Sequence, residues 1–167
     1  QPTGGSALFD CVSITKSTQQ FGGYVGGTVE VAAALNITAV ARYCGGPSES
    51  TAPNVSTEVI LAIKQDRGAS FDVMTAVNVT LGSNCPKDGG FAWSNLPFPV
   101  TLSPGKTYLL AFDNHPRTPF YGVVIPTVAG SGVTVHSAFT QSSHLDVHNG
   151  IAIWNIASLP GHMYGPL

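Results

Sequence analysis

The stretch that decides the fold is residues 98–113, Phe-Pro-Val-Thr-Leu-Ser-Pro-Gly-Lys-Thr-Tyr-Leu-Leu-Ala-Phe-Asp. Its pattern predicts one strand over residues 100–102 and a second strand over residues 106–112. Between them, Pro104 fixes its own φ angle and Gly105 accepts the left-handed conformation, and this pair favours a tight turn. We therefore predict a β-hairpin at this point of the chain.

The second strand of this hairpin is apolar on both faces. Side chains alternate between the two faces of a strand, which places Tyr108, Leu110 and Phe112 on one face and Thr107, Leu109 and Ala111 on the other. A strand of this kind belongs in the middle of a sheet that is covered on both sides.

Short segments with a strand-like pattern recur along the chain, separated by turns rich in Gly, Pro and Ser. We expect further strands over residues 7–16, 28–34, 37–43, 57–64, 71–81, 121–125, 133–139 and 151–156. No segment keeps a period of 3.6 residues, and Gly or Pro interrupts most windows longer than about 12 residues. The sequence therefore predicts an all-β protein, a single antiparallel β-sandwich of jelly-roll type with about nine to ten strands.

The chain has the length of one ordinary domain. Its 167 residues are enough to bury a core without metal or disulfide support. We expect residues 1–20 to form a strand-like N-terminal arm, able to act as a donor strand, and residues 21–167 to form the sandwich.

Residues 21–112 carry a succession of segments that resembles a known family. These segments include Phe-Gly-Gly-Tyr-Val from Phe21, Thr-Glu-Val-Ile-Leu-Ala-Ile-Lys from Thr57, and the pattern Pro-Val-x-Leu-x-x-Gly-x-x-Tyr from Pro99 to Tyr108. They resemble extracellular β-sandwich domains of unknown function that recur in secreted and cell-surface proteins. The resemblance implies the sandwich fold and a building block rather than an enzyme.

The composition favours an extracellular protein and argues against two classes of partner. Charged residues make up 10% of the chain, less than half of the usual share of about 25%. The net charge is −2 and the seven basic residues are scattered singly, which argues against nucleic acid. No apolar run approaches the ~20 residues of a membrane helix, so we expect no membrane insertion.

The chain begins at Gln1 without Met, which suits a secreted product whose signal peptide has been removed.

Three sequons for N-linked glycosylation begin at Asn36, Asn54 and Asn78. We expect Asn36 at a turn, Asn54 in a loop and Asn78 on the polar face of its strand, so that none of them needs to be buried. In a secreted protein these positions are candidates for N-linked glycans. The alternative is that they are plain surface asparagines.

The chain has three cysteines. If the strands over residues 37–43, 57–64 and 71–81 run in alternating directions, Cys44 and Cys85 come to the same end of the sandwich. We therefore predict a Cys44–Cys85 disulfide, formed in an oxidising compartment. Cys11 is then left over, either buried as a small apolar residue or paired with another chain.

Two polar clusters give weaker signals for chemistry. His144, Asp146 and His148 share one side of an extended segment, a spacing that can hold a divalent metal but that a Ser-rich loop also produces by chance. Asp113 and His115 have no accompanying nucleophile elbow, metalloprotease helix motif or carboxylate pair. We expect no metal, no cofactor and no enzymatic activity.

Four aromatic residues suggest an alternative function. Together they can form a sugar-stacking platform, although such residues more often fill a sandwich core. They are Trp93, Tyr121, Trp154 and Tyr164. The alternative is a carbohydrate-binding or adhesion module that uses loop aromatics.

The ends of the chain predict a mode of assembly. The chain stops where a further strand is expected, and a sheet that lacks an edge strand can accept one from a neighbour. The arm residues that would enter the neighbour are Leu8, Phe9, Cys11, Val12 and Ile14. Because this contact is heterologous, it propagates into a filament. We therefore predict a secreted, N-glycosylated structural protein that polymerises with itself into an extracellular fibril or surface coat, unless the arm pairs within its own sandwich.

Overall fold

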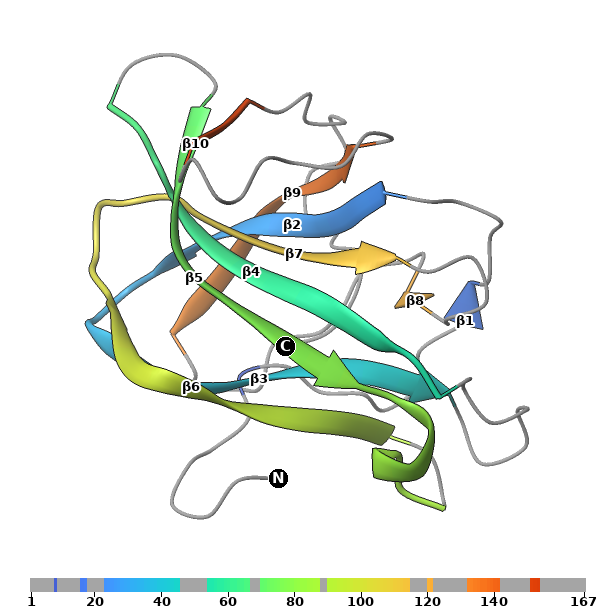
Figure 1. Ribbon diagram of the computed structural model, residues 1–167. Helices are drawn as coiled ribbons and strands as arrows, with labels where there is room; N and C mark the ends of the chain where they lie inside the picture. Colours follow the sequence, from blue (N-terminus) through green and yellow to red (C-terminus); the bar gives the residue numbers. More distant parts are fainter. Residues whose placement is uncertain are drawn as a thin grey trace.

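The computed structural model (Figure 1) describes residues 8, 16–17, 23–45, 54–66, 70–87, 90–114, 120–121, 132–141 and 151–153. In these residues every strand pair is antiparallel, which confirms the predicted all-β class. The strands are β1 (Lys16–Ser17), β2 (Gly23–Val31), β3 (Leu35–Gly45), β4 (Ser56–Lys64), β5 (Ser70–Thr80), β6 (Gly90–Leu102), β7 (Tyr108–Asn114), β8 (Phe120–Tyr121), β9 (Val133–Gln141) and β10 (Ile151–Ile153), and a 3-10 turn, η1, covers Gly82–Asn84.

The larger layer is a six-stranded sheet in the order β10-β5-β4-β7-β2-β9. Its β7 lies between β4 and β2, where Leu110 pairs with Leu61 on one side and with Gly27 on the other. Both faces of β7 are buried, because alternate residues join two separate hydrophobic clusters. The central position that the sequence predicts for this strand is confirmed.

The second layer is the pair β3-β6, which runs beneath the larger sheet in the view of Figure 1. Inward-facing side chains of both layers form the main core. The six-stranded sheet contributes Val29, Val31, Val59, Leu61, Val79, Tyr108, Leu110, Phe112 and Val133, and the pair contributes Val40, Cys44, Ala92, Leu96 and Leu102. Two antiparallel layers that enclose one core make a β-sandwich.

The outer face of the six-stranded sheet has an apolar end and a polar end. The apolar end is a second buried cluster, formed by Ile60, Ala62, Phe71, Leu109 and Ala111. Toward the polar end, the same rows of β4 and β5 continue with Ser56 and Glu58 beside Thr80 and Asn78. Burial of the apolar end explains why β4 is apolar on both faces only in its second half.

The predicted hairpin over residues 98–113 is wrong. Its two strands belong to different layers, because β6 pairs with β3 whereas β7 pairs with β2 and β4. The turn itself is present, with Gly105 at a φ of 80°, and the Ser103 N–H donates to the Tyr108 hydroxyl at 2.7 Å. The turn therefore crosses from one layer to the other, because both strands bury apolar side chains in the shared core from opposite sides.

A wide bulge interrupts β6. Val100 pairs with Ile37 and Asn95 pairs with Ala39, so residues 96–99 stand opposite Thr38 alone. Pro97 and Pro99 have no N–H group to donate to a ladder, which suits them to this unpaired segment. Phe98 between them has 80% of its surface exposed.

Strand boundaries differ from the prediction near Asn36. The turn lies at residues 32–34, where the Ala32 N–H donates to the Gly132 carbonyl at 2.8 Å. Asn36 is therefore inside β3, paired with Thr101, although its side chain is exposed as expected. Within the part of the chain that the structure describes, no helix has the length and apolarity to cross a membrane.

The predicted strand over residues 7–16 is described only at its two ends. Lys16 belongs to β1, which pairs with β8 through Lys16 and Tyr121. Leu8 is partly buried and packs against the main core cluster. Residues 9–15, which include Phe9, Cys11, Val12 and Ile14, lie outside the described residues.

Candidate functional site

The predicted disulfide is present. Cys44, near the end of β3, is bonded to Cys85, which follows η1, and their Cα atoms are 5.8 Å apart. Because η1 continues from β5, the bond joins the β3-β6 layer to the six-stranded sheet. It therefore closes one end of the sandwich.

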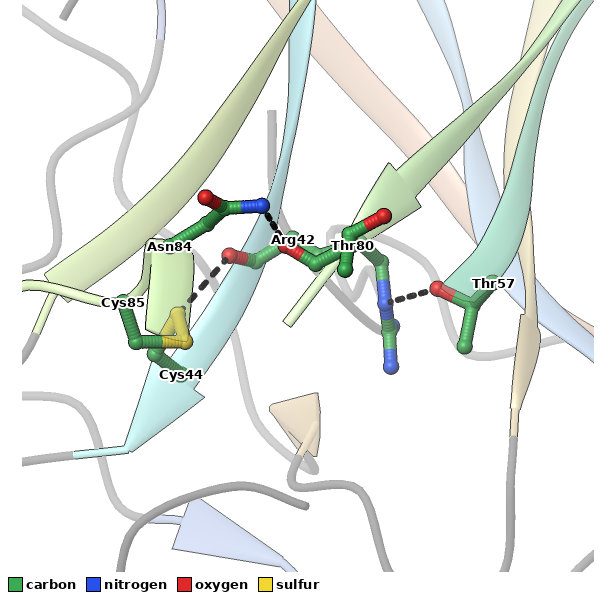
Figure 2. The surroundings of a disulfide bond; sticks show 6 residues. All are labelled: Arg42, Cys44, Thr57, Thr80, Asn84 and Cys85. Carbon is green, nitrogen blue, oxygen red and sulfur yellow. Dashed lines mark hydrogen bonds between the residues drawn. A yellow bond between two sulfur atoms is a disulfide. The ribbon is translucent and has the colours of Figure 1, made fainter. Parts of the chain in front are cut away.

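The segment around Cys85 is held by local hydrogen bonds (Figure 2). Figure 2 shows the Asn84 side-chain amide, which donates to the Thr80 carbonyl at 3.2 Å. The Cys85 N–H also donates to the Gly82 carbonyl, at 2.9 Å. Sγ of Cys44 lies 3.9 Å from the Arg42 carbonyl oxygen, but this is a contact only, because a disulfide sulfur carries no hydrogen. These bonds fix the chain directly after the sequon that begins at Asn78.

Two of the three sequons lie side by side on the polar end of the outer face. The register of β4 and β5 pairs Ser56 with Thr80 and Glu58 with Asn78. The hydroxyl groups of Ser56 and Thr80, which are the essential hydroxyls of the two sequons, form a hydrogen bond of 2.7 Å. Residues 54–58 and 78–80, with both sequons, are called the sequon strip below. Its asparagines, Asn54 and Asn78, are both exposed.

Gly82 permits close packing against the first of these sequons. Its φ is 76°, and a Cβ atom at this position would lie 2.7 Å from the Cα of Asn54. The Leu81 N–H donates to the Val55 carbonyl at 2.8 Å, which extends the contact between the two segments beyond the ends of the strands. Glycine is therefore required here both for its conformation and for its small size.

The third sequon is in the other layer. The Thr101 hydroxyl donates to Oδ1 of Asn36 at 2.7 Å. A glycan attaches at the amide nitrogen, Nδ2, so this hydrogen bond occupies the oxygen that glycosylation leaves unchanged. Thr38, the hydroxyl residue of this sequon, is exposed and faces the bulge of β6.

Sequence reasoning missed the buried cation at Arg42. Its Nε donates to the Thr57 hydroxyl at 3.2 Å, and its guanidinium carbon lies 3.6 Å from the centre of the Phe112 ring. Burial lowers the pKa of Arg42 to about 9, and the Asp113 carboxylate opposes this shift. The alternation of side chains along a strand could have indicated this burial, because Arg42 lies in the same inward-facing row of β3 as Val40 and Cys44.

The other sequence candidates are only partly covered. Trp93 is partly buried on β6 and meets Phe91 edge to face, with ring centres 6.3 Å apart, and Tyr121 is in β8. Trp154, Tyr164, His115, His144, Asp146 and His148 lie outside the described residues. Within the described ranges no three side chains of His, Cys, Asp or Glu gather as a metal site would require.

No family model, no curated protein and no solved structure matches this chain significantly. The resemblance of residues 21–112 to extracellular β-sandwich domains therefore stays a prediction from the residues themselves.

Proposed function

We propose that this protein is a secreted, N-glycosylated structural subunit of an extracellular fibril or surface coat, built on a jelly-roll type of sandwich. Its N-terminal arm, with Leu8, Phe9, Cys11, Val12 and Ile14, inserts into a neighbouring copy. The observation that carries the proposal is the packing of Leu8 against the main core. Among the described residues of the arm, Leu8 supplies an apolar contact with the core, and a contact of this kind can be exchanged between copies.

The exchange follows the logic of domain swapping. A neighbour's Leu8 would make the same contact that the chain's own Leu8 makes, so the swapped state needs no new binding site. Each molecule would give its arm to one neighbour and receive an arm from another. Such a contact does not close on itself, and it therefore extends into a polymer.

The chemistry of the sandwich supports an extracellular setting. A disulfide such as Cys44–Cys85 persists where the environment is oxidising. The side chains of Asn36, Asn54 and Asn78 are exposed, which an N-linked glycan requires. A chain with only 10% charged residues also gains solubility from glycans.

A single substitution in the arm tests the assembly. In Leu8→Asp a carboxylate replaces the apolar side chain that packs against the core, so the concentration needed for polymers to form is expected to rise by at least about tenfold. Ala33→Asp is the matched control, because it adds the same charge to an exposed turn. Light scattering over a concentration series measures both variants, and equal behaviour of the two would contradict arm-mediated assembly.

Glycosylation is tested separately on protein made in eukaryotic secretory cells. Asn36→Gln, Asn54→Gln and Asn78→Gln are each expected to remove one glycan from the intact mass. Enzymatic removal of N-glycans should bring all variants to the mass of the bare chain. A wild-type chain that already has the bare mass would contradict this part of the proposal.

A carbohydrate-binding or adhesion module is the second candidate, favoured by the partly exposed Phe91 and Trp93 pair on β6. Aromatic rings bind the apolar faces of sugars by stacking. Under this alternative, Trp93→Ala abolishes binding in a glycan-array screen of monomeric protein. Unchanged assembly of the same variant would separate this function from the first.

A further inference from the structure

The sequon strip places two acceptor sequences in mutual contact. Asn54-Val-Ser56 leads into β4, Asn78-Val-Thr80 ends β5, and the register sets Ser56 opposite Thr80. The acceptor sequence requires a hydroxyl group two residues after the asparagine, so a glycosylating enzyme must reach that hydroxyl. In the folded chain a single hydrogen bond of 2.7 Å engages the hydroxyls of both sequons.

The backbone of the sequon strip is also held in place, by strand pairing and by packing against the core. Asn78 lies within the 11-residue strand β5 and pairs with Glu58. The residue between Asn78 and its threonine, Val79, is 1% exposed because its side chain is in the main core. An enzyme that takes Asn78 and Thr80 together into its active site must therefore pull this part of β5 away from the core and from β4.

The sequon at Asn54 is held in a similar way by the segment that follows β5. The Val55 carbonyl accepts the Leu81 N–H at 2.8 Å, and Gly82 lies against the backbone of Asn54. The two asparagine side chains are exposed, but the segments that carry them are bound to each other on both sides of the hydroxyl pair. Exposure of the asparagine alone is therefore not enough for modification.

We propose that pairing of β4 with β5 closes both acceptor sites, so that glycans at Asn54 and Asn78 are attached before this hairpin forms. The inference rests on the proposed function, since it takes both sequons to be glycan acceptors. In the reaction, Nδ2 of the asparagine bonds to C1 of a lipid-linked oligosaccharide diphosphate and loses a proton. The C1–O bond breaks, and the lipid diphosphate leaves with its electron pair.

The test compares the folded chain with peptides in which strand pairing cannot occur. The full chain is made in bacteria without glycans and with its disulfide formed, and peptides of residues 50–60 and 74–84 supply the unpaired reference. Each is incubated with oligosaccharyltransferase and a lipid-linked oligosaccharide, and the rate at each asparagine is followed by mass spectrometry. Transfer at positions 54 and 78 is expected to be slower in the folded chain by more than about tenfold, because it requires local opening.

A matched control shows that the enzyme can act on the folded chain. The double variant Ala32→Asn/Ala34→Thr creates an acceptor in the exposed turn between β2 and β3. Its reference is a peptide of residues 27–37 with the same two substitutions. Because this acceptor is outside the strands, its rate in the folded chain is expected to stay within about threefold of the peptide rate.

The outcomes separate the inference from the proposed function. Rates at positions 54 and 78 that equal those of the peptides would overturn the inference and leave glycosylation intact. Equal slowing at position 32 would also overturn it, because the turn is not closed by the hydroxyl pair. Peptides that accept no glycan, together with secretory-cell protein that carries none at Asn54 and Asn78, would contradict the proposed glycosylation of both sites.

Discussion

Single residues in the core show how strictly the two layers constrain the sequence. Arg42 is a cation in an apolar interior, held by Thr57 and by the ring of Phe112. Gly26 is the opposite case, because β2 approaches β7 so closely there that no side chain fits. Each leads to a measurable expectation.

Gly26→Ala is expected to lower the free energy of unfolding by about 3 kcal/mol. The added Cβ would overlap the Leu110 carbonyl and lie 2.7 Å from the Cα of Ala111, so the backbone of a central strand must shift. Gly105→Ala is the control. An alanine at a φ of 80° costs about 1 kcal/mol, but its Cβ would meet no atom within 4 Å. Urea denaturation compares the two, and a smaller loss for Gly26→Ala would be inconsistent with the close approach.

Arg42→Met/Thr57→Val is expected to match or exceed wild-type stability at neutral pH, by up to about 2 kcal/mol. The double change removes a buried charge together with the Thr57 hydroxyl that accepts a hydrogen bond from it. Arg42→Met alone should be less stable than the double variant, because it leaves the buried Thr57 hydroxyl without this donor. Chemical denaturation at about pH 7 would contradict the expectation if the double variant were less stable than the wild type or than Arg42→Met.

The pH dependence of the same pair has a defined sign. Burial lowers the pKa of Arg42 to about 9 in the folded chain, well below its ordinary value, so above about pH 9 the unfolded state binds more protons. The stability of the wild type relative to the double variant should therefore rise as the pH increases above about 9. The measurement uses a Cys11→Ser background to prevent thiol exchange with the disulfide, and a constant difference across this range would contradict it.

At the scale of elements, the sequence predicts what each strand buries better than which strand it pairs with. The two apolar faces of residues 108–112 correctly place β7 in the middle of a covered sheet. The hairpin prediction was wrong because Pro104 and Gly105 define a turn but not the layer that each flanking strand joins. That choice depends on pairing with β3, β2 and β4, which are far away in sequence. The disulfide was predictable from strand direction, whereas the Ser56–Thr80 contact depends on a register that no local pattern encodes.

Loss of the disulfide is expected to destabilise the sandwich by about 4 kcal/mol. Cys44 and Cys85 are 41 residues apart in sequence, and closing a loop of this length restricts the unfolded chain by about that amount. Cys44→Ser/Cys85→Ser is compared with Cys11→Ser by thermal and urea denaturation. Equal stability of the two variants would show that the bond does not restrain the unfolded chain.

At the scale of the whole molecule, the sandwich leaves its three sequons on two surfaces. Asn54 and Asn78 project from the outer face of the six-stranded sheet, and Asn36 belongs to the β3-β6 layer. Glycans at these places would keep both surfaces hydrated and unable to stack. Under the proposed assembly, subunit contact would be left to the arm, and we expect growth in one direction rather than lateral aggregation.

The central claim is arm-mediated assembly, and the most direct test is negative-stain imaging of the natively purified protein beside a version that lacks residues 1–16. The deletion removes Leu8, which packs against the core, and Lys16 of β1, and it leaves Ser17 and the strands that follow. We predict filaments from the full chain and monomers from the shortened one. Monodisperse monomers from both, or filaments from both, would contradict the account.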